Sequence, residues 1–178
     1  MEGLSDGTLA GRAKDGDRAA FGVLVERHYG LIYRVAYRVL GNRADAEDAA
    51  HDVCVALAGR IARYSGRSKF TTWLYQVVLN TARDHMRKQT RGRALGAAWA
   101  QADELEQAGH KDRQRLAAWI YESLGQLKDD LRETALLVLA EGLSHAEAGE
   151  VLNIKEATVS WRMHEVRKHL KGMAGTLS

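Results

Sequence analysis

The sequence contains no proline, although it is 178 residues long. Average usage of about 5% would give roughly nine prolines in a chain of this length. Proteins rich in β-structure or loops normally use some proline in their turns, whereas alanine, leucine, arginine and glutamate favour helices. The absence of proline therefore favours an all-α fold.

The sequence has a single cysteine, Cys54, which excludes an internal disulfide and a Cys-rich zinc cluster. Its apolar runs are only a few residues long, far short of the roughly 20 residues that a membrane helix needs. The first 16 residues lack a basic start followed by an apolar run, which argues against a secretory signal. We therefore expect a cytoplasmic protein without membrane insertion.

The net charge of +3 is small, but the charge is unevenly distributed. Residues 60–93 hold nine basic side chains and one acidic side chain, for a net charge of +8. Residues 94–150 have a net charge of −6, and residues 151–178 a net charge of +3. Two basic segments separated by an acidic one fit a nucleic-acid-binding protein, although a run of charge can also be a solvated surface.

Apolar residues recur at helical spacing along most of the chain, with an interruption in the middle. Residues 91–114 are polar and rich in glycine and charge, so we expect a linker there. Helices are predicted at residues 21–40, 44–61, 69–88, 116–127, 130–140, 144–152 and 156–171. The pattern predicts an all-α fold in which two small helical domains are joined by a linker.

The C-terminal segment shows the features of a helix-turn-helix. Ser144 and Glu147 form a capping-box pattern, and Asn153 suits the turn that separates two helices. In the second helix the apolar residues share one face, and they are Val159, Met163, Val166 and Leu170. Varied polar groups on the other faces are what major-groove recognition needs. An ordinary helical hairpin with a solvated face is the alternative.

The helix predicted at residues 69–88 has two distinct faces. Leu74, Val77, Val78, Thr81 and His85 share one of them, and His85 is expected to be a core histidine. The other face carries an aromatic ring, amides and arginines, namely Trp73, Gln76, Asn80, Arg83, Asp84 and Arg87. Such a strip suits single-stranded nucleic acid, because rings stack on bases and arginines neutralise phosphates. Trp73 could equally be a residue at the edge of the core.

Three stretches in this order resemble the extracytoplasmic-function (ECF) group of bacterial sigma factors, in the sigma-70 family. Residues 20–29 with 45–53 are similar to the part of the family's first domain that contacts the RNA polymerase clamp. Residues 70–75 with 80–88 are similar to its promoter −10 segment, and residues 143–170 to its −35 helix-turn-helix. The resemblance implies a domain 2 at residues 1–90, a linker at 91–114 and a domain 4 at 115–178.

The resemblance also implies roles for individual residues. The expected contacts with the −10 strand are Arg67, Lys69, Trp73, Asn80, Arg83 and Arg87. The expected contacts with the −35 duplex are Thr158, Ser160, Trp161, Arg162, His164, Glu165 and Lys168. The expected contacts with the clamp of core RNA polymerase are Asp45, Asp48 and Asp52. Trp161 could instead pack on its own domain or contact another protein, and Glu165 could read a cytosine or point off the groove.

The expected function is that of a polymerase specificity subunit, which is not an enzyme and uses no cofactor or metal. The expected partners are core RNA polymerase, promoter DNA and an anti-sigma factor. The family's usual glycine or proline near the turn is replaced here by residues 154–157. A conventional helix-turn-helix regulator, which binds duplex DNA without polymerase, is the alternative. A nucleic-acid enzyme is disfavoured, because the sequence shows no metal-ligand cluster, phosphate loop or nucleophile–base pair.

Overall fold

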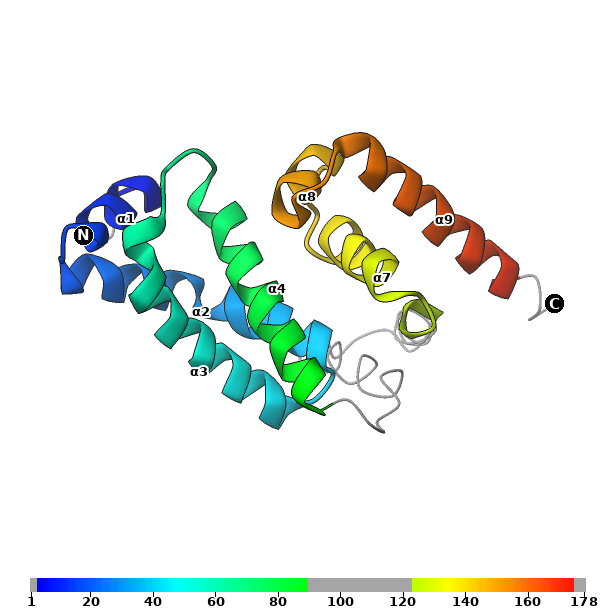
Figure 1. Ribbon diagram of the computed structural model, residues 1–178, viewed down its shortest axis with the longest axis horizontal. Coiled ribbons are helices and arrows are strands. Elements are labelled where there is room, and N and C mark those ends of the chain that lie inside the picture. Colours follow the sequence, from blue (N-terminus) through cyan, green and yellow to red (C-terminus); the bar gives the residue numbers. More distant parts are fainter. Residues whose placement is uncertain (1–2, 90–122, 175–178) are drawn as a thin grey trace. The chain divides into compact units, whose positions relative to one another are not determined.

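The computed structural model describes residues 3–89 and 123–174, and every regular element in these ranges is helical (Figure 1). The chain divides into two compact units, Met1–Thr90 and Arg91–Ser178. The predicted all-α class with a C-terminal helix-turn-helix is confirmed. The predicted linker at 91–114 and most of the helix predicted at 116–127 lie outside the described residues.

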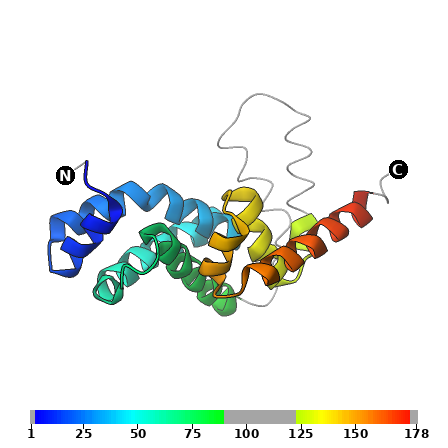
Figure 2. The same cartoon turned by 90° about the horizontal axis from the view of Figure 1, so that it is seen from above.

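The first unit is a bundle of four helices with a short 3₁₀ turn. Its elements are α1 (Asp6–Lys14), α2 (Arg18–Leu40), α3 (Arg43–Arg60), η1 (Ile61–Arg63) and α4 (Phe70–Gln89). Helix α2 contacts α1, α3 and α4, and the two views in Figures 1 and 2 show these helices side by side. The bundle buries Leu24, Ile32, Val53, Leu74 and Val78 almost completely. The ends of α2, α3 and α4 fall within three residues of the predicted ends.

Side-chain caps set where α2 and α3 begin. Asp17 accepts hydrogen bonds from the backbone N–H groups of Ala20 and Ala19, both at 3.0 Å. The Ala20 N–H and the Arg12 guanidinium lower the pKa of the Asp17 carboxyl below its ordinary value. At the start of α3, the Asn42 side chain accepts from the Asp45 N–H at 2.9 Å. The Asn42 cap lies where the sequence predicted a break between helices, whereas the Asp17 cap starts α2 three residues before the predicted start at residue 21.

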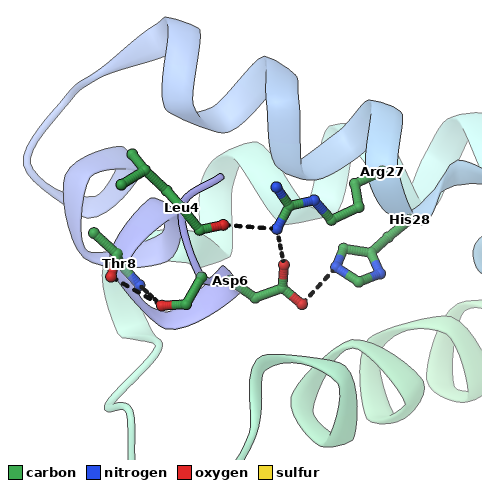
Figure 3. A network of polar contacts seen from close by, with 6 residues as sticks. Leu4, Asp6, Thr8, Arg27 and His28 are labelled. Atoms are coloured by element: carbon green, nitrogen blue, oxygen red, sulfur yellow. Dashed lines mark hydrogen bonds and ion pairs between the residues drawn. The ribbon is translucent and has the colours of Figure 1, made fainter. Parts of the chain in front are cut away.

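Helix α1 was not predicted, because only Leu9, Ala10 and Ala13 are buried along its nine residues. Its position depends on contacts with α2 that no local pattern reveals (Figure 3). The Asp6 carboxylate lies 2.6 Å from the Arg27 guanidinium and 2.8 Å from Nε2 of the buried His28. Arg27 also donates to the Leu4 carbonyl oxygen at 3.0 Å. One carboxylate thus ties the start of α1 to the middle of α2.

The second unit contains residues 123–125 in a helical turn, α7 (Asp129–Ala135), η3 (Leu136–Ala140), α8 (His145–Leu152) and α9 (Glu156–Ala174). The helix predicted at 130–140 changes at Leu136 into the π-helical turn η3. The predicted capping box is present, with the Ser144 side chain and Glu147 each bonded to the other's backbone. Asn153 has a φ of 55° and ends α8 in the left-handed region.

Gly149 allows the helix-turn-helix turn to close. A Cβ atom at this position would lie 2.9 Å from the Ile154 carbonyl oxygen and 3.5 Å from the Glu156 nitrogen. The Gly149 carbonyl accepts a hydrogen bond from the Ile154 N–H at 3.0 Å. The close approach needed at the turn is therefore provided by a glycine inside α8, rather than by one in the turn itself.

No helix in the described part of the chain combines the length and apolar character needed to cross a bilayer.

Candidate nucleic-acid interface

Most of the circumference of α4 is buried. It packs on α1, α2 and α3. The exposed fraction of Leu74, Val78, Leu79 and Ala82 is 1% or less. The open part is a narrow strip that begins at half-buried Trp73 and continues to exposed Asn80 and half-buried Arg83. It ends at Arg87, which is exposed. The residues expected to contact the −10 strand are thus accessible, and the helix that carries them is firmly held.

The N-terminal end of this strip, at Trp73, packs on an aromatic cluster. The ring of Trp73 lies 5.4 Å from that of Tyr64 and 5.7 Å from that of Phe70, between centroids. Tyr64 and Phe70 are buried, whereas one part of Trp73 remains open to solvent. Trp73 therefore lies at the edge of the core and keeps some accessible surface. Its position is compatible both with a core-edge role and with stacking on a base.

The loop before α4 is held by the same cluster. The Tyr64 hydroxyl donates to the Ser68 carbonyl oxygen at 2.7 Å, and burial raises the pKa of that hydroxyl above its ordinary value. A pocket of about 540 Å³ opens beside the loop. Its lining consists of Asp6, Gly7, Tyr64, Gly66, Arg67, Ser68, Lys69, Phe70 and Thr71. The exposed cations Arg67 and Lys69 therefore border a concave surface formed by the loop, the start of α1 and the first residues of α4.

In the second unit, α9 has one buried stripe and a broad open side. Val159, Met163 and Val166 are fully buried and Leu170 is half-buried, as predicted. Trp161 is 59% exposed, so it is not part of the core of its unit. Of the other residues expected to contact the −35 duplex, Ser160, His164 and Lys168 are exposed. Thr158, Arg162 and Glu165 are half-buried.

Both halves of the chain match models of known protein regions. Residues 24–92 match the model described as Sigma-70 region 2, and residues 117–170 match Sigma-70, region 4. The ECF RNA polymerase sigma factor SigW of Bacillus subtilis is 31% identical over 90% of this chain and 91% of its own length. The protein belongs to the ECF sigma factors. It is therefore an RNA polymerase sigma factor, and this reading takes precedence over a free-standing helix-turn-helix regulator.

Solved structures agree with this assignment. CnrH, solved in complex with the cytosolic domain of CnrY, is 29% identical and matches with a TM-score of 0.72 over 97% of this chain and 99% of CnrH. The sigma factor RpoE of Bartonella quintana, solved with the anti-sigma factor NepR, has a TM-score of 0.65 over 87% of this chain and 96% of its own. At 20% identity, the second match supports the fold alone.

The three aspartates of α3 that are expected to contact the clamp differ in exposure and in their side-chain partners. Asp45 is half-buried, and its carboxylate accepts a hydrogen bond from the Asn42 amide. Asp48 is exposed. The Asp52 carboxylate lies 2.8 Å from Nε2 of His85 on α4, so the histidine expected in the core instead lies at the core edge and bonds to a surface carboxylate. Val55, one turn further along α3, is 61% exposed.

Two side chains on α9 of the sigma factor have intramolecular partners that the sequence did not reveal. The Arg162 guanidinium lies 3.4 Å from the Asp130 carboxylate and 3.4 Å from the Thr134 hydroxyl, both on α7. The Ser160 hydroxyl lies 2.9 Å from Nδ1 of His145 at the start of α8. These partners are 32, 28 and 15 residues away in sequence, so helical periodicity carried no signal for them.

Residues 3–89 and 123–174 contain no group of three or more His, Cys, Asp or Glu side chains arranged to hold a metal ion. Cys54 is half-buried, and burial raises the pKa of its thiol above the ordinary value. A raised pKa leaves less of the reactive thiolate at neutral pH.

Proposed function

We propose that this sigma factor directs promoter-specific initiation by reading the −35 duplex with α9 and capturing one −10 strand with α4 and the preceding loop. The observation that carries the proposal is the outer side of α9, where varied hydrogen-bonding groups lie opposite a fully buried apolar stripe. A recognition helix needs this division, because one side anchors it and the other reaches base edges. We assign residues 1–90 to domain 2, 91–114 to the linker and 115–178 to domain 4.

The proposed −35 contacts fall into two groups. Ser160, Trp161, His164 and Lys168 are exposed and can meet the duplex without rearrangement. Thr158, Arg162 and Glu165 are half-buried, and Arg162 would have to leave Asp130 to pair with guanine or phosphate. We therefore propose that the first group makes the main contacts, and that Arg162 mainly holds α9 on α7.

The proposed −10 site combines three kinds of side chain along α4 and its loop. Trp73 offers a ring edge for stacking, and Asn80 offers an exposed amide for reading a base. Arg83 donates to the Asn80 side-chain oxygen at 3.0 Å, which fixes the orientation of that amide. Arg67, Lys69 and Arg87 provide positive charge for the phosphates, and the pocket beside the loop provides space for an unstacked base.

Energetics require a large partner. Unpairing about ten base pairs at roughly 1.4 kcal/mol per step costs on the order of 14 kcal/mol. Stacking of one or two captured bases at about 1–3 kcal/mol each returns only part of this cost. The remainder has to come from core RNA polymerase, so the sigma factor supplies specificity and is itself no enzyme. Its place of action is then the cytoplasm, where promoter DNA and polymerase are found.

We propose that the polymerase clamp binds the outer face of α3, through Asp45, Asp48 and Asp52. Asp48 is the most informative of the three, because it is exposed and its side chain makes no hydrogen bond or ion pair to another described residue. Replacing Asp48 by Arg should weaken assembly with core polymerase, measured by gel filtration of the mixture. Asp84→Arg, on α4, is the matched control and should assemble normally. Equal assembly by both variants would refute the clamp assignment.

We also propose that an anti-sigma factor regulates this protein. RpoE of Bartonella quintana, whose fold is similar, was solved in complex with the anti-sigma factor NepR. The exposed Trp161 and Val55 are apolar surface on which such a protein could dock.

Run-off transcription with added core polymerase and a promoter library tests the proposed function. A promoter-specific transcript that requires the sigma factor is the expected result, and tight duplex binding without any such transcript would refute it. Asn80→Ala should then reduce open-complex formation about 5- to 150-fold, which corresponds to the loss of about 1–3 kcal/mol from one base contact. Binding to a −35 duplex should be unchanged in this variant.

A further inference from the structure

His145 and Ser160 form a hydrogen bond on the side of the helix-turn-helix that is proposed to face DNA. His145 is the first residue of α8, and Ser160 lies in the second turn of α9. Nδ1 of His145 and the Ser160 hydroxyl oxygen are 2.9 Å apart. Nε2 of His145 makes no hydrogen bond to any residue that the structure describes. A histidine on one helix therefore holds a serine on the recognition helix, and its second nitrogen is still available.

The hydrogen bond can run in either direction, and the direction decides what Ser160 offers to DNA. When Nδ1 carries no proton, it accepts the hydroxyl proton of Ser160, and the serine has only lone pairs left for the duplex. When Nδ1 carries a proton, it donates to the serine oxygen, and the hydroxyl proton is free to be donated elsewhere. The doubly protonated imidazolium permits only the second arrangement.

We propose that His145 is a positioning residue for −35 recognition, which sets whether Ser160 acts as a hydrogen-bond donor or acceptor toward DNA. The inference rests on the proposed function and adds a residue outside the recognition helix. With imidazolium at position 145, Ser160 donates to acceptors such as guanine O6 and N7, thymine O4 or a phosphate oxygen. With neutral imidazole whose Nδ1 lacks a proton, Ser160 accepts from donors such as cytosine N4 or adenine N6.

Binding to DNA and protonation of His145 should reinforce each other. Phosphate charge favours the imidazolium form, whose free Nε2–H can also donate to a phosphate oxygen. The π-helical turn η3, which packs on α8, carries no titratable side chain. The charged and titratable side chains on α8, just before α9 and on its adjacent turns are Glu147, Glu150, Lys155, Glu156, Arg162 and His164, so both signs of charge are present.

The test measures promoter affinity of the full chain assembled with core polymerase, by fluorescence anisotropy at constant ionic strength between about pH 6 and pH 8. For the unaltered protein we expect affinity to rise roughly three- to tenfold from the higher to the lower pH, the size of one added hydrogen bond. His145→Asn keeps a polar group near the Nδ1 position but cannot take up a proton. It should fold normally and show a weaker dependence on pH.

Two further variants separate positioning from other effects of histidine. Ser160→Ala should remove the part of the pH dependence that acts through the serine and keep the part due to the imidazolium charge, so the double variant should show the same pH dependence as His145→Asn alone. His51→Asn removes an exposed histidine on α3, outside the proposed DNA contacts, and should keep the pH dependence of the unaltered protein. At low pH Ser160 is expected to act as a hydrogen-bond donor. Replacing the base pair that Ser160 contacts should therefore alter affinity more at pH 6 than at pH 8.

Two results would overturn the inference: a pH dependence in His145→Asn equal to that of the unaltered protein, or no pH dependence in the unaltered protein. In either case the proposed function would stand, as long as the assembled polymerase still gives promoter-specific transcripts. Loss of all promoter-specific transcription by the unaltered protein would instead refute the proposed function, so the two failures are distinguishable.

Discussion

Helices α4 and α9 are the two helices proposed to meet DNA, and their surroundings are opposite. Helix α4 packs on three other helices and leaves only a narrow strip open. Helix α9 is anchored by a single stripe of buried residues and leaves most of its circumference open. Their tryptophans show the same difference, because Trp73 lies in an aromatic cluster, whereas Trp161 is 59% exposed.

The difference corresponds to the state of the DNA that each helix is proposed to bind. A melted strand is flexible, so ordering it on the protein loses conformational entropy. If the protein surface is already rigid, its own side chains lose little additional entropy on binding. Trp73 fixed by two rings and Asn80 fixed by Arg83 form such a surface. Duplex DNA is already stiff, so side chains on α9 can order as they bind. On this view, changes on α4 affect both stability and function, whereas changes on α9 mainly affect function.

Trp73→Ala should have the largest effect on stability. It removes a half-buried ring and its contacts with Tyr64 and Phe70, and we expect a loss of about 2–3 kcal/mol, below the cost for a fully buried tryptophan. Urea unfolding and hydrogen exchange of the α4 amides would measure it. Trp73→Phe is the control and should recover most of the loss. A loss below about 0.5 kcal/mol would contradict the comparison, since Trp73 would then resemble a surface residue.

Gly149→Ala should have a smaller effect, confined to the second unit. The added methyl would approach the Ile154 carbonyl to 2.9 Å, and such overpacking costs about 1–3 kcal/mol. Gly172→Ala on α9 is the matched control, because nothing lies within 4 Å of its added methyl. In that exposed helical position alanine should stabilise by about 0.4–1 kcal/mol. Thermal unfolding should therefore shift in opposite directions in the two variants, and shifts of the same sign would refute the close-approach role of Gly149.

The sequence predicted those helices whose signals are local. Asp17, Asn42 and Ser144 begin α2, α3 and α8, and each is followed by an apolar stripe at helical spacing. Helix α1 was missed because its stripe consists of one leucine and two alanines, and its place depends on the distant Arg27 and His28. The π-helical turn at residues 136–140 was missed because these apolar residues fit an α-helix equally well.

The candidate site was predictable as a set of faces, but its internal bonds were not. Periodicity placed Asn80 and Ser160 on open sides of their helices, and both are exposed. The bonds of Ser160 with His145, Arg162 with Asp130, and His85 with Asp52 join different helices. Spacing along one helix carries no information about such partners, since they depend on how helices pack. The importance of Gly149 also emerges only when the backbone of the turn is known.

Trp161→Ala should have the smallest effect on stability, within about 0.5 kcal/mol, because its ring is mostly in solvent and contributes little to the core. The same substitution should weaken promoter binding if the ring packs on the DNA backbone, and should weaken anti-sigma binding if it docks on that protein. Urea unfolding of the two single variants, Trp161→Ala and Trp73→Ala, compares their losses in the free energy of unfolding directly. A stability loss for Trp161→Ala as large as that for Trp73→Ala would mean that both helices are held alike, and the distinction between a rigid −10 surface and an adaptable −35 surface would fail.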